Sequence, residues 1–191
     1  PFPVRRIVLD DVLDDFFFDQ KYDHLIGASR VAGKGQVVNL NVRRKIATVD
    51  LPGLPHLGSG ITWNWKGTPV LATTNLKDGI VSVIDMRDWK NVATIPVSGP
   101  GFFLRSHEAT PYAWVDGMNG PRKDTLQVID KRTLEVVAAL TPAPSKTAAH
   151  IEFDRYGKYA LASVWEIDGA IVVYDAGTFA EVKRIPANKP V

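Results

Sequence analysis

Five side chains able to do chemistry recur at matching places along the chain. Four of them, Asp14, Ser59, Arg105 and His150, are separated by 45, 46 and 45 residues, and His56 lies three residues before Ser59. An acid, a hydroxyl, a guanidinium and imidazoles are not what the wall of a packed channel needs. At equivalent positions of a repeat they resemble the few convergent polar groups of a ligand pocket.

Each of these side chains also has a structural interpretation. A histidine in a β-protein is more often a hydrogen-bonded structural residue than a ligand, and we take this interpretation for His24 and His107. Arg105 could pair with Glu108 or Asp14, and Asp14 and Asp15 could be solvated loop carboxylates. For the histidines near the shared position, both interpretations stay open.

Glycines and aromatic residues flank the same positions. The loop 55–60 (PHLGSG) sets His56 beside two glycines, and the segment 98–101 (SGPG) precedes Phe102. Glycines allow the backbone to approach a bulky ligand closely. Aromatic walls suit a planar apolar ligand with acidic edges, and a guanidinium such as that of Arg105 can hold a carboxylate with two hydrogen bonds.

Composition excludes several kinds of site. The 191 residues include no cysteine, which rules out disulfides, thiolate metal sites, a cysteine nucleophile and covalent c-type heme attachment. Lys+Arg 23 against Asp+Glu 21 gives a net charge of +2, too weak a field to imply nucleic acid. No stretch approaches the ~18 apolar residues of a membrane helix. The chain begins at Pro1 without a methionine or a signal peptide, which is typical of a processed protein or a fragment.

The elements that position these residues follow from a repeat. Three β-rich anchors lie at 83–85 (VID), 128–130 (VID) and 173–175 (VYD), and a weaker copy lies at 38–40 (VNL). Steps from Asn39 through the three anchor aspartates are 46, 45 and 45 residues. A period of ~40–50 residues built only from strands predicts a β-propeller. The anchor aspartates are predicted to cap the turns that follow them.

We therefore predict an all-β fold, a partial β-propeller of about four four-stranded blades in one domain. The predicted blades span residues 13–52, 59–98, 101–141 and 147–187, and residues 1–9 are expected to be the outer strand of a preceding blade. Third strands such as 170–174 (AIVVY) are almost continuously apolar, as expected for strands covered on both faces. Four blades and an extra strand favour half of a larger propeller, completed by upstream blades or a second chain.

Four segments together resemble a known family. They are residues 13–19 (LDDFFFD), 55–60 (PHLGSG), 99–108 (GPGFFLRSHE) and 147–153 (TAAHIEF). Along essentially its whole length the chain resembles the heme d1-binding propeller of the cytochrome cd1 nitrite reductase family. The resemblance implies that the chain is the C-terminal half of an eight-bladed heme d1 propeller.

Within that family the chain is most similar to the dihydro-heme d1 dehydrogenase branch, in residues 55–60 and 99–108 and in the histidine at position 150. The resemblance implies that His150 is an axial ligand of the iron. It implies that His56 is the catalytic acid or base near the propionate that becomes an acrylate. It further implies that Arg105 holds a tetrapyrrole carboxylate, and that the cofactor is also lined by Asp14, Ser59 and Phe102.

Nitrite reduction to nitric oxide is the alternative within the family. Its nitrite reductases carry a pair of distal histidines, of which one matches His56 and the other aligns with Asp14. A carboxylate cannot replace a cationic imidazole that stabilises bound nitrite, so we favour the dehydrogenase. A non-catalytic binding propeller is the alternative from another class.

Cofactor, partner and location are also implied by the resemblance. The cofactor is heme d1 or its dihydro precursor, which contains iron, and the location is the periplasm. Oxidation of a propionate to an acrylate removes two electrons and two protons, and the electrons are expected to pass to a c-type heme on another domain or a cytochrome partner. An iron-binding imidazole needs an acceptor for its other nitrogen, and Glu152, two residues from His150 on an alternating strand, is a candidate.

Overall fold

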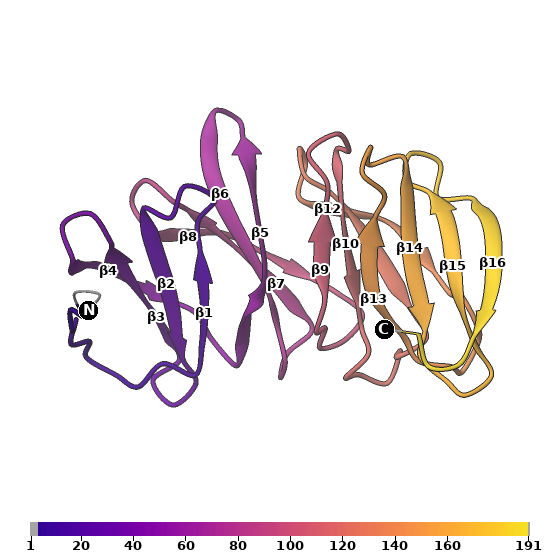
Figure 1. Ribbon diagram of the computed structural model, residues 1–191, viewed down its shortest axis with the longest axis horizontal. Helices are drawn as coiled ribbons and strands as arrows, with labels where there is room; N and C mark the ends of the chain where they lie inside the picture. The colour runs from indigo at the N-terminus through magenta and orange to yellow at the C-terminus, as the bar shows by residue number, and fades with distance from the viewer. Residues whose placement is uncertain (1–3, 191) are drawn as a thin grey trace.

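The computed structural model describes residues 4–190, and within that range all regular secondary structure is β-strand (Figure 1). Sixteen strands form four four-stranded antiparallel sheets, each from four consecutive strands. The first two sheets consist of β1 (Asp15–Phe18), β2 (His24–Ser29), β3 (Lys34–Asn39), β4 (Arg44–Asp50), β5 (Pro55–Trp65), β6 (Thr68–Asn75), β7 (Ile80–Asp85) and β8 (Lys90–Pro96). The other two consist of β9 (Leu104–Ser106), β10 (Tyr112–Asp116), β11 (Leu126–Asp130), β12 (Glu135–Leu140), β13 (Ala148–Phe153), β14 (Tyr159–Val164), β15 (Gly169–Asp175) and β16 (Glu181–Ala187).

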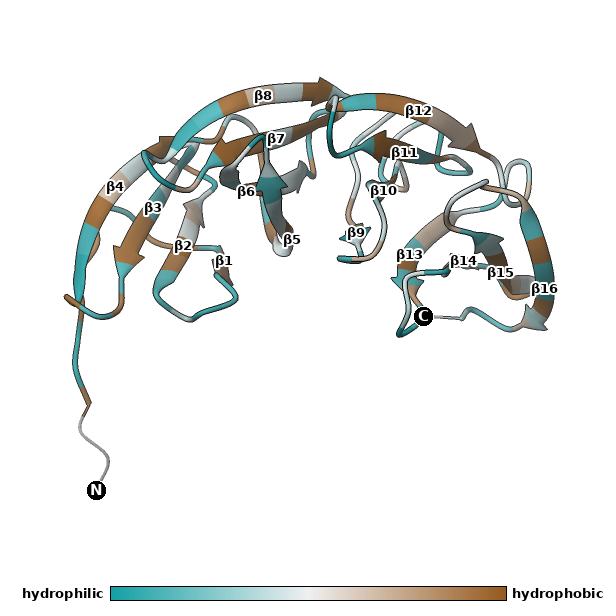
Figure 2. Ribbon diagram, turned by 90° about the horizontal axis from the view of Figure 1, so that it is seen from above, coloured by the Kyte–Doolittle hydropathy of each residue, from teal (hydrophilic) through white to brown (hydrophobic). Residues whose placement is uncertain are grey.

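The four sheets stand side by side as blades in an arc (Figure 2). The first strand of each blade lies on the concave side of the arc, and the fourth strand lies on the convex side. This arrangement confirms the predicted β-propeller architecture. It also places residues from the start of successive first strands on one concave surface, where a shared site can form.

Apolar side chains between neighbouring blades hold the arc together. One buried cluster joins the second and third blades and includes Val83 and Val115, and another joins the third and fourth and includes Trp114 and Ile151. All four side chains are at most 1% exposed. Burial of one such side chain stabilises a fold by about 1.5–3 kcal/mol, so the blade interfaces, rather than single blades, supply the core.

The third strands show how burial depends on neighbours. In β7, within the arc, every residue from Val81 to Asp85 is buried. In β15, of the last blade, burial alternates, with Val172 fully buried and Ile171 and Val173 half-buried. The continuously apolar sequence predicted cover on both faces, but the fourth blade has a neighbouring blade on one side only in this chain.

The anchor aspartates cap turns as predicted. Each carboxylate accepts a hydrogen bond from a backbone N–H two residues on, at 2.8, 2.8 and 3.0 Å for Asp85, Asp130 and Asp175. These hydrogen bonds close the turn between the third and fourth strands of a blade. The repeated aspartate in the sequence therefore marks the same capped turn in each of these blades.

Some boundaries differ from the prediction. The second blade begins at Pro55 rather than at residue 59, so His56 lies within β5 and not in a loop. Residues 4–9 are not a strand, contrary to the prediction for 1–9, and residues 1–3 lie outside the described part of the chain. A strand exists only through hydrogen bonds to a neighbour, and this chain supplies no sheet on that side of the first blade.

Candidate functional site

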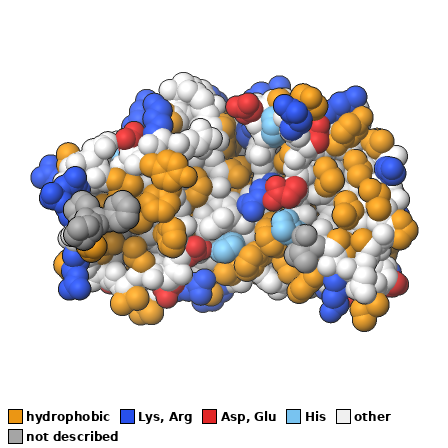
Figure 3. Space-filling view, viewed as in Figure 1, with side chains coloured by type: hydrophobic (Ala, Val, Ile, Leu, Met, Phe, Trp, Pro, Cys, Tyr) orange, Lys and Arg blue, Asp and Glu red, His pale blue; other side chains and the backbone are white. Residues whose placement is uncertain are grey.

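Four rings from the second, third and fourth blades form a continuous row. His56 and Phe102 have centroids 4.2 Å apart, Phe102 and Phe103 4.9 Å, and Phe103 and His150 4.5 Å with their planes within 8°. The two histidines come from first strands, and the two phenylalanines come from the loop before β9. Near the middle of the face shown in Figure 3, histidine side chains lie beside acidic ones among hydrophobic side chains.

His150 is aimed by a β-bulge in β13. The pairing of β13 with β14 shifts between Ala149 and Ile151, which leaves His150 as the unpaired residue. Its φ of 51° lies in the left-handed region that few residues other than glycine adopt. Bulges re-aim a side chain and are common beside functional sites. Here the bulge turns the imidazole flat onto Phe103.

Neither nitrogen of the His150 ring makes a hydrogen bond within the described residues. Nδ1 is buried and has no hydrogen-bond partner within the described residues. The side chain is 26% exposed, and its Nε2 has only a long contact of 3.5 Å with Glu152 Oε1. Glu152 therefore approaches the nitrogen left for a ligand, and does not supply the acceptor for the other nitrogen that strand alternation predicted. The bulge is the reason, because it breaks the alternation at His150.

Arg105 lies beside the same ring. Its Nε donates to Glu152 Oε1 at 3.2 Å, and its guanidinium carbon lies 6.0 Å from the Phe103 centroid. Glu152, rather than Glu108 or Asp14, is thus its ionic partner. Its Nη1 donates to the Leu104 carbonyl, and its Nη2 has no hydrogen bond within the described residues. That nitrogen is open to an anionic group of a ligand.

Asp15 holds His56 across the boundary between the first two blades. Asp15 Oδ2 lies 2.9 Å from His56 Nδ1, and the same carboxylate accepts the Gly58 N–H at 3.2 Å. The two side chains are only 17% and 15% exposed for His56 and Asp15. A carboxylate only accepts, so Nδ1 carries the hydrogen, which leaves Nε2 as the nitrogen that can accept a proton. The sequence offered no way to tell which of two adjacent acids faces the next blade.

The other two polar residues of the predicted set have internal partners. Asp14 Oδ2 accepts the Arg30 N–H at 2.8 Å and so closes a turn of the first blade. Ser59 is 1% exposed, and its hydroxyl donates to the Phe102 carbonyl at 2.6 Å. Ser59 therefore helps to hold Phe102, a member of the row of rings, in place. Direct contact of Asp14 or Ser59 with a ligand stays a prediction.

Asp116 fixes the two phenylalanines in place. Its carboxylate accepts the Phe102 N–H at 2.8 Å and the Phe103 N–H at 2.9 Å. Burial raises the pKa of Asp116 from 3.8 to about 6, although these hydrogen bonds act in the opposite direction. The loop lies so close that a Cβ at Gly101 would meet the Asp116 carbonyl at 2.4 Å. That glycine serves a contact within the protein, whereas its sequence context predicted a contact with a ligand.

An apolar cavity of about 310 Å³ adjoins one end of the row. Its lining consists of Phe102, Phe103, Met118, Asn119, Ala149, His150, Ser163, Trp165 and Pro190. Apolar walls with a few polar groups are typical of cofactor and ligand sites. This surface therefore combines flat apolar side chains with an imidazole that makes no hydrogen bond to the described residues and with a guanidinium.

The remaining histidines have the structural partners expected of them. His24 Nδ1 lies 2.9 Å from Asp19 Oδ2 and its Nε2 lies 3.2 Å from Asn39 Nδ2. His107 Nδ1 accepts the Ala109 N–H at 3.1 Å. Within residues 4–190 no three His, Asp or Glu side chains gather as a metal site. No helix long and apolar enough to cross a membrane occurs in the same range.

The sequence model of the family described as "Cytochrome D1 heme domain" matches residues 1–191. The chain belongs to the cytochrome D1 heme domain family. A relative from Pseudomonas aeruginosa, "Dihydro-heme d1 dehydrogenase", is 50% identical over 190 residues, which cover 100% of this chain and 38% of that protein. "Protein NirF" from Stutzerimonas stutzeri is 34% identical over 138 residues, 72% of this chain and 33% of that protein.

Solved structures agree with this family. "Dihydro-heme d1 dehydrogenase NirN in complex with DHE" superposes with a TM-score of 0.94 at 50% identity, covering 98% of this chain and 40% of that chain. Hydrazine synthase of Kuenenia stuttgartiensis superposes with a TM-score of 0.73 at 15% identity, covering 92% of this chain and 49% of that chain, which shows the fold alone. The chain spans about two fifths of the length of its dehydrogenase relative.

Proposed function

We propose that this chain is the heme d1-binding part of a periplasmic oxidoreductase that oxidises a propionate of dihydro-heme d1 to an acrylate. The observation that carries the proposal is the row of rings joining a fixed histidine, His56, to an uncommitted one, His150. The 50% identity to a dihydro-heme d1 dehydrogenase over the whole chain supports it.

The residues present fit an iron tetrapyrrole. His150 Nε2 would bind the iron, because it makes no hydrogen bond to the described residues and belongs to a side chain that is 26% exposed. The faces of Phe102 and Phe103 suit a flat macrocycle. Arg105 would hold a carboxylate of the macrocycle through its open Nη2, with Glu152 keeping the guanidinium in place. When bound, the conjugated tetrapyrrole supplies the path by which electrons leave the oxidised side chain.

His56 is the group best placed to take a proton. Asp15 on Nδ1 sets the tautomer that leaves Nε2 as the acceptor, and stabilises the imidazolium that forms. Phe102, 4.2 Å from the ring, excludes water from one side of it. Asp15 acts through His56 and is therefore a positioning residue.

The two electrons released must leave through a further group. With no cysteine, the chain cannot carry a covalent c-type heme, so a c-type heme of another domain or a partner cytochrome is the acceptor in this proposal. The chain alone would then bind the tetrapyrrole and turn it over poorly. The rest of the propeller would complete the wall of the site that this arc leaves open on its concave side.

Conversion by the full-length protein tests the proposal. The protein containing this domain is incubated with dihydro-heme d1 and an oxidised c-type cytochrome, and the tetrapyrrole is analysed by mass spectrometry. Loss of two hydrogens, with reduction of two equivalents of cytochrome, is expected. In a separate assay with nitrite and reduced cytochrome, nitric oxide formed by a protein that fails this conversion would instead identify a nitrite reductase. If neither reaction occurs, the non-catalytic binding propeller remains.

A further inference from the structure

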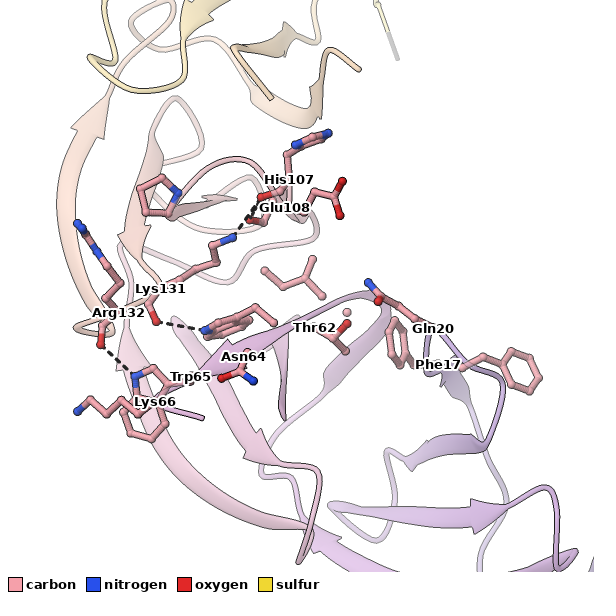
Figure 4. A pocket seen from close by; sticks show the side chains of 16 residues that line it. Phe17, Gln20, Thr62, Asn64, Trp65, Lys66, His107, Glu108, Lys131 and Arg132 are labelled. Carbon is pink, nitrogen blue, oxygen red and sulfur yellow. Dashed lines mark hydrogen bonds between the residues drawn. The ribbon is translucent and has the colours of Figure 1, made fainter. Parts of the chain in front are cut away.

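A second hollow lies at the other end of the inner strands. It has a volume of about 910 Å³ and is bounded by the ends of β1 and β5, the loop after β9 and the turn between β11 and β12 (Figure 4). We call it the distal groove. It shares no lining residue with the cavity beside His150. Its volume lies in the range of small-molecule sites.

Two tryptophans give the distal groove fixed aromatic walls. Trp63 Nε1 donates to the Lys131 carbonyl at 3.1 Å, and Trp65 Nε1 donates to the Arg132 carbonyl at 3.0 Å. Both indole donors are thereby used, so the rings offer a ligand their carbon faces. Phe17 lines the groove from the first blade.

Lys131 brings a buried positive charge to this wall. The residue is 9% exposed, and its ammonium donates to the His107 carbonyl at 3.2 Å (Figure 4). An ammonium has three N–H donors, and this one forms no ion pair within the described residues. Burial, without a compensating negative charge, lowers the pKa of Lys131. A buried cation lacking a carboxylate partner is rare in proteins.

The other charges of the groove do not neutralise Lys131. Arg132 is paired with Asp130, and Lys66 lies over the ring of Trp65 at 4.6 Å. Glu108 is the acidic residue of the lining, and it makes no ion pair with Lys131 within residues 4–190. A neutral or cationic aromatic ligand would leave the Lys131 ammonium uncompensated, whereas an anionic one would complete its hydrogen bonds.

We propose that the distal groove is a binding site for a planar aromatic carboxylate. The carboxylate accepts from Lys131, and the ring lies against Trp63 and Trp65. The site is separate from the tetrapyrrole site and does not depend on it. A flat acid of this class, whether a small aromatic acid or the edge of a larger macrocycle, meets both requirements of the groove.

Nuclear magnetic resonance of the tryptophan indole N–H groups tests the proposal. The ¹⁵N-labelled chain is titrated with 2-naphthoate and, as the uncharged control, with 2-naphthamide. Saturable shifts of the Trp63 and Trp65 signals are expected, while Trp165, which lines the cavity beside His150, stays unchanged. The amide oxygen can still accept from Lys131 but carries no negative charge, so the ion pair is lost and the amide is expected to bind about tenfold more weakly or worse.

Substitutions decide between a charge effect and mere stacking. Lys131→Met is expected to weaken 2-naphthoate about tenfold and to weaken 2-naphthamide less, whereas Lys90→Met, which changes an exposed lysine on β8, is expected to change neither affinity. If Lys131→Met does not fold, Trp65→Leu is expected to weaken both probes. Equal affinity for acid and amide, shifts confined to Trp165, unsaturable binding, or wild-type affinity in Trp65→Leu would each overturn the proposal.

Discussion

His56 and His150 lie in the first strands of two blades, yet their surroundings differ. His56 is gripped by Asp15 of the preceding blade at 2.9 Å, whereas His150 makes no hydrogen bond within the described residues. The first histidine sits in a strand region that pairs with Thr74, and the second is the unpaired residue of a bulge. In the proposed function, Asp15 sets the tautomer of His56 for proton transfer, whereas His150 keeps a nitrogen for the iron.

The difference comes from the residues that each blade boundary supplies. At the first boundary an acid faces the histidine nitrogen. At the last boundary the nearby acid, Glu152, is shared with Arg105, which lies closer to it, at 3.2 Å against 3.5 Å for His150. Equivalent positions of a repeated fold can thus differ in their chemistry. Substitutions can test the surroundings of His56 and of His150 separately.

Removal of the fixed imidazole has the largest expected effect. In the full-length protein, His56→Ala is expected to lower the conversion of dihydro-heme d1 by about 100-fold or more, because general acid–base catalysis contributes ~10²–10⁴-fold. Tetrapyrrole affinity is expected to stay close to that of the wild type. Stopped-flow turnover and equilibrium titration measure the two quantities. An unchanged turnover would remove His56 from the reaction.

Substitution of Asp15, the hydrogen-bond partner of His56, tests the role of His56 further. Asp15→Asn is expected to lower turnover by about tenfold to 100-fold, since the amide can also donate to Nδ1 and so favour the wrong tautomer. The ¹⁵N chemical shifts of the His56 ring, measured in this chain, report the tautomer directly. If Nδ1 keeps its hydrogen in the variant while turnover falls, the positioning role of Asp15 is wrong.

The loop between the two histidines has a pH dependence with a defined sign. The pKa of Asp116 is about 6 in the folded chain and near 3.8 when unfolded, so the folded state binds more protons between these values. Its contribution to the free energy of unfolding therefore falls as pH rises from about 4 to 6, by up to about 3 kcal/mol.

Urea denaturation of the wild type and of Asp116→Asn at a series of pH values isolates this contribution. The free energy of unfolding of the wild type, relative to that of the variant, is expected to fall from pH 4 to pH 6 and then to level off. A difference that rises with pH would show that the backbone hydrogen bonds from Phe102, Phe103 and Met118, and not burial, dominate the pKa of Asp116.

Substitution of Ser59, whose hydroxyl donates to the Phe102 carbonyl behind the row of four rings, has the smallest expected effect. Ser59→Ala leaves the Phe102 carbonyl without its donor and is expected to lower the free energy of unfolding by about 1–2 kcal/mol. Tetrapyrrole affinity is expected to change less than threefold, a difference of under about 0.7 kcal/mol. Thermal denaturation and spectral titration give both values, and a large loss of affinity at full stability would show that Ser59 contacts the tetrapyrrole directly.

The repeat made the fold predictable, because the Val-Ile-Asp anchors encode both a buried third strand and the turn after it. The same spacing found His56, Arg105 and His150. The sequence spacing selected Asp14 rather than Asp15. Which of the two side chains points toward the second blade depends on the backbone direction at the start of β1, and contacts with that blade determine it. The part played by Asp116 was invisible, since it joins β10 to a loop thirteen residues earlier through backbone groups that carry no sequence signal.

Visible spectra of the chain titrated with heme d1 and with its dihydro precursor test the central claim most directly. The wild type is expected to give a saturable spectral shift, and His150→Ala is expected to lose the part due to iron ligation. His24→Ala serves as the matched control and is expected to behave as the wild type, because His24 lines neither the distal groove nor the cavity beside His150. A saturable shift that survives in His150→Ala would contradict the assignment of His150 as the iron ligand.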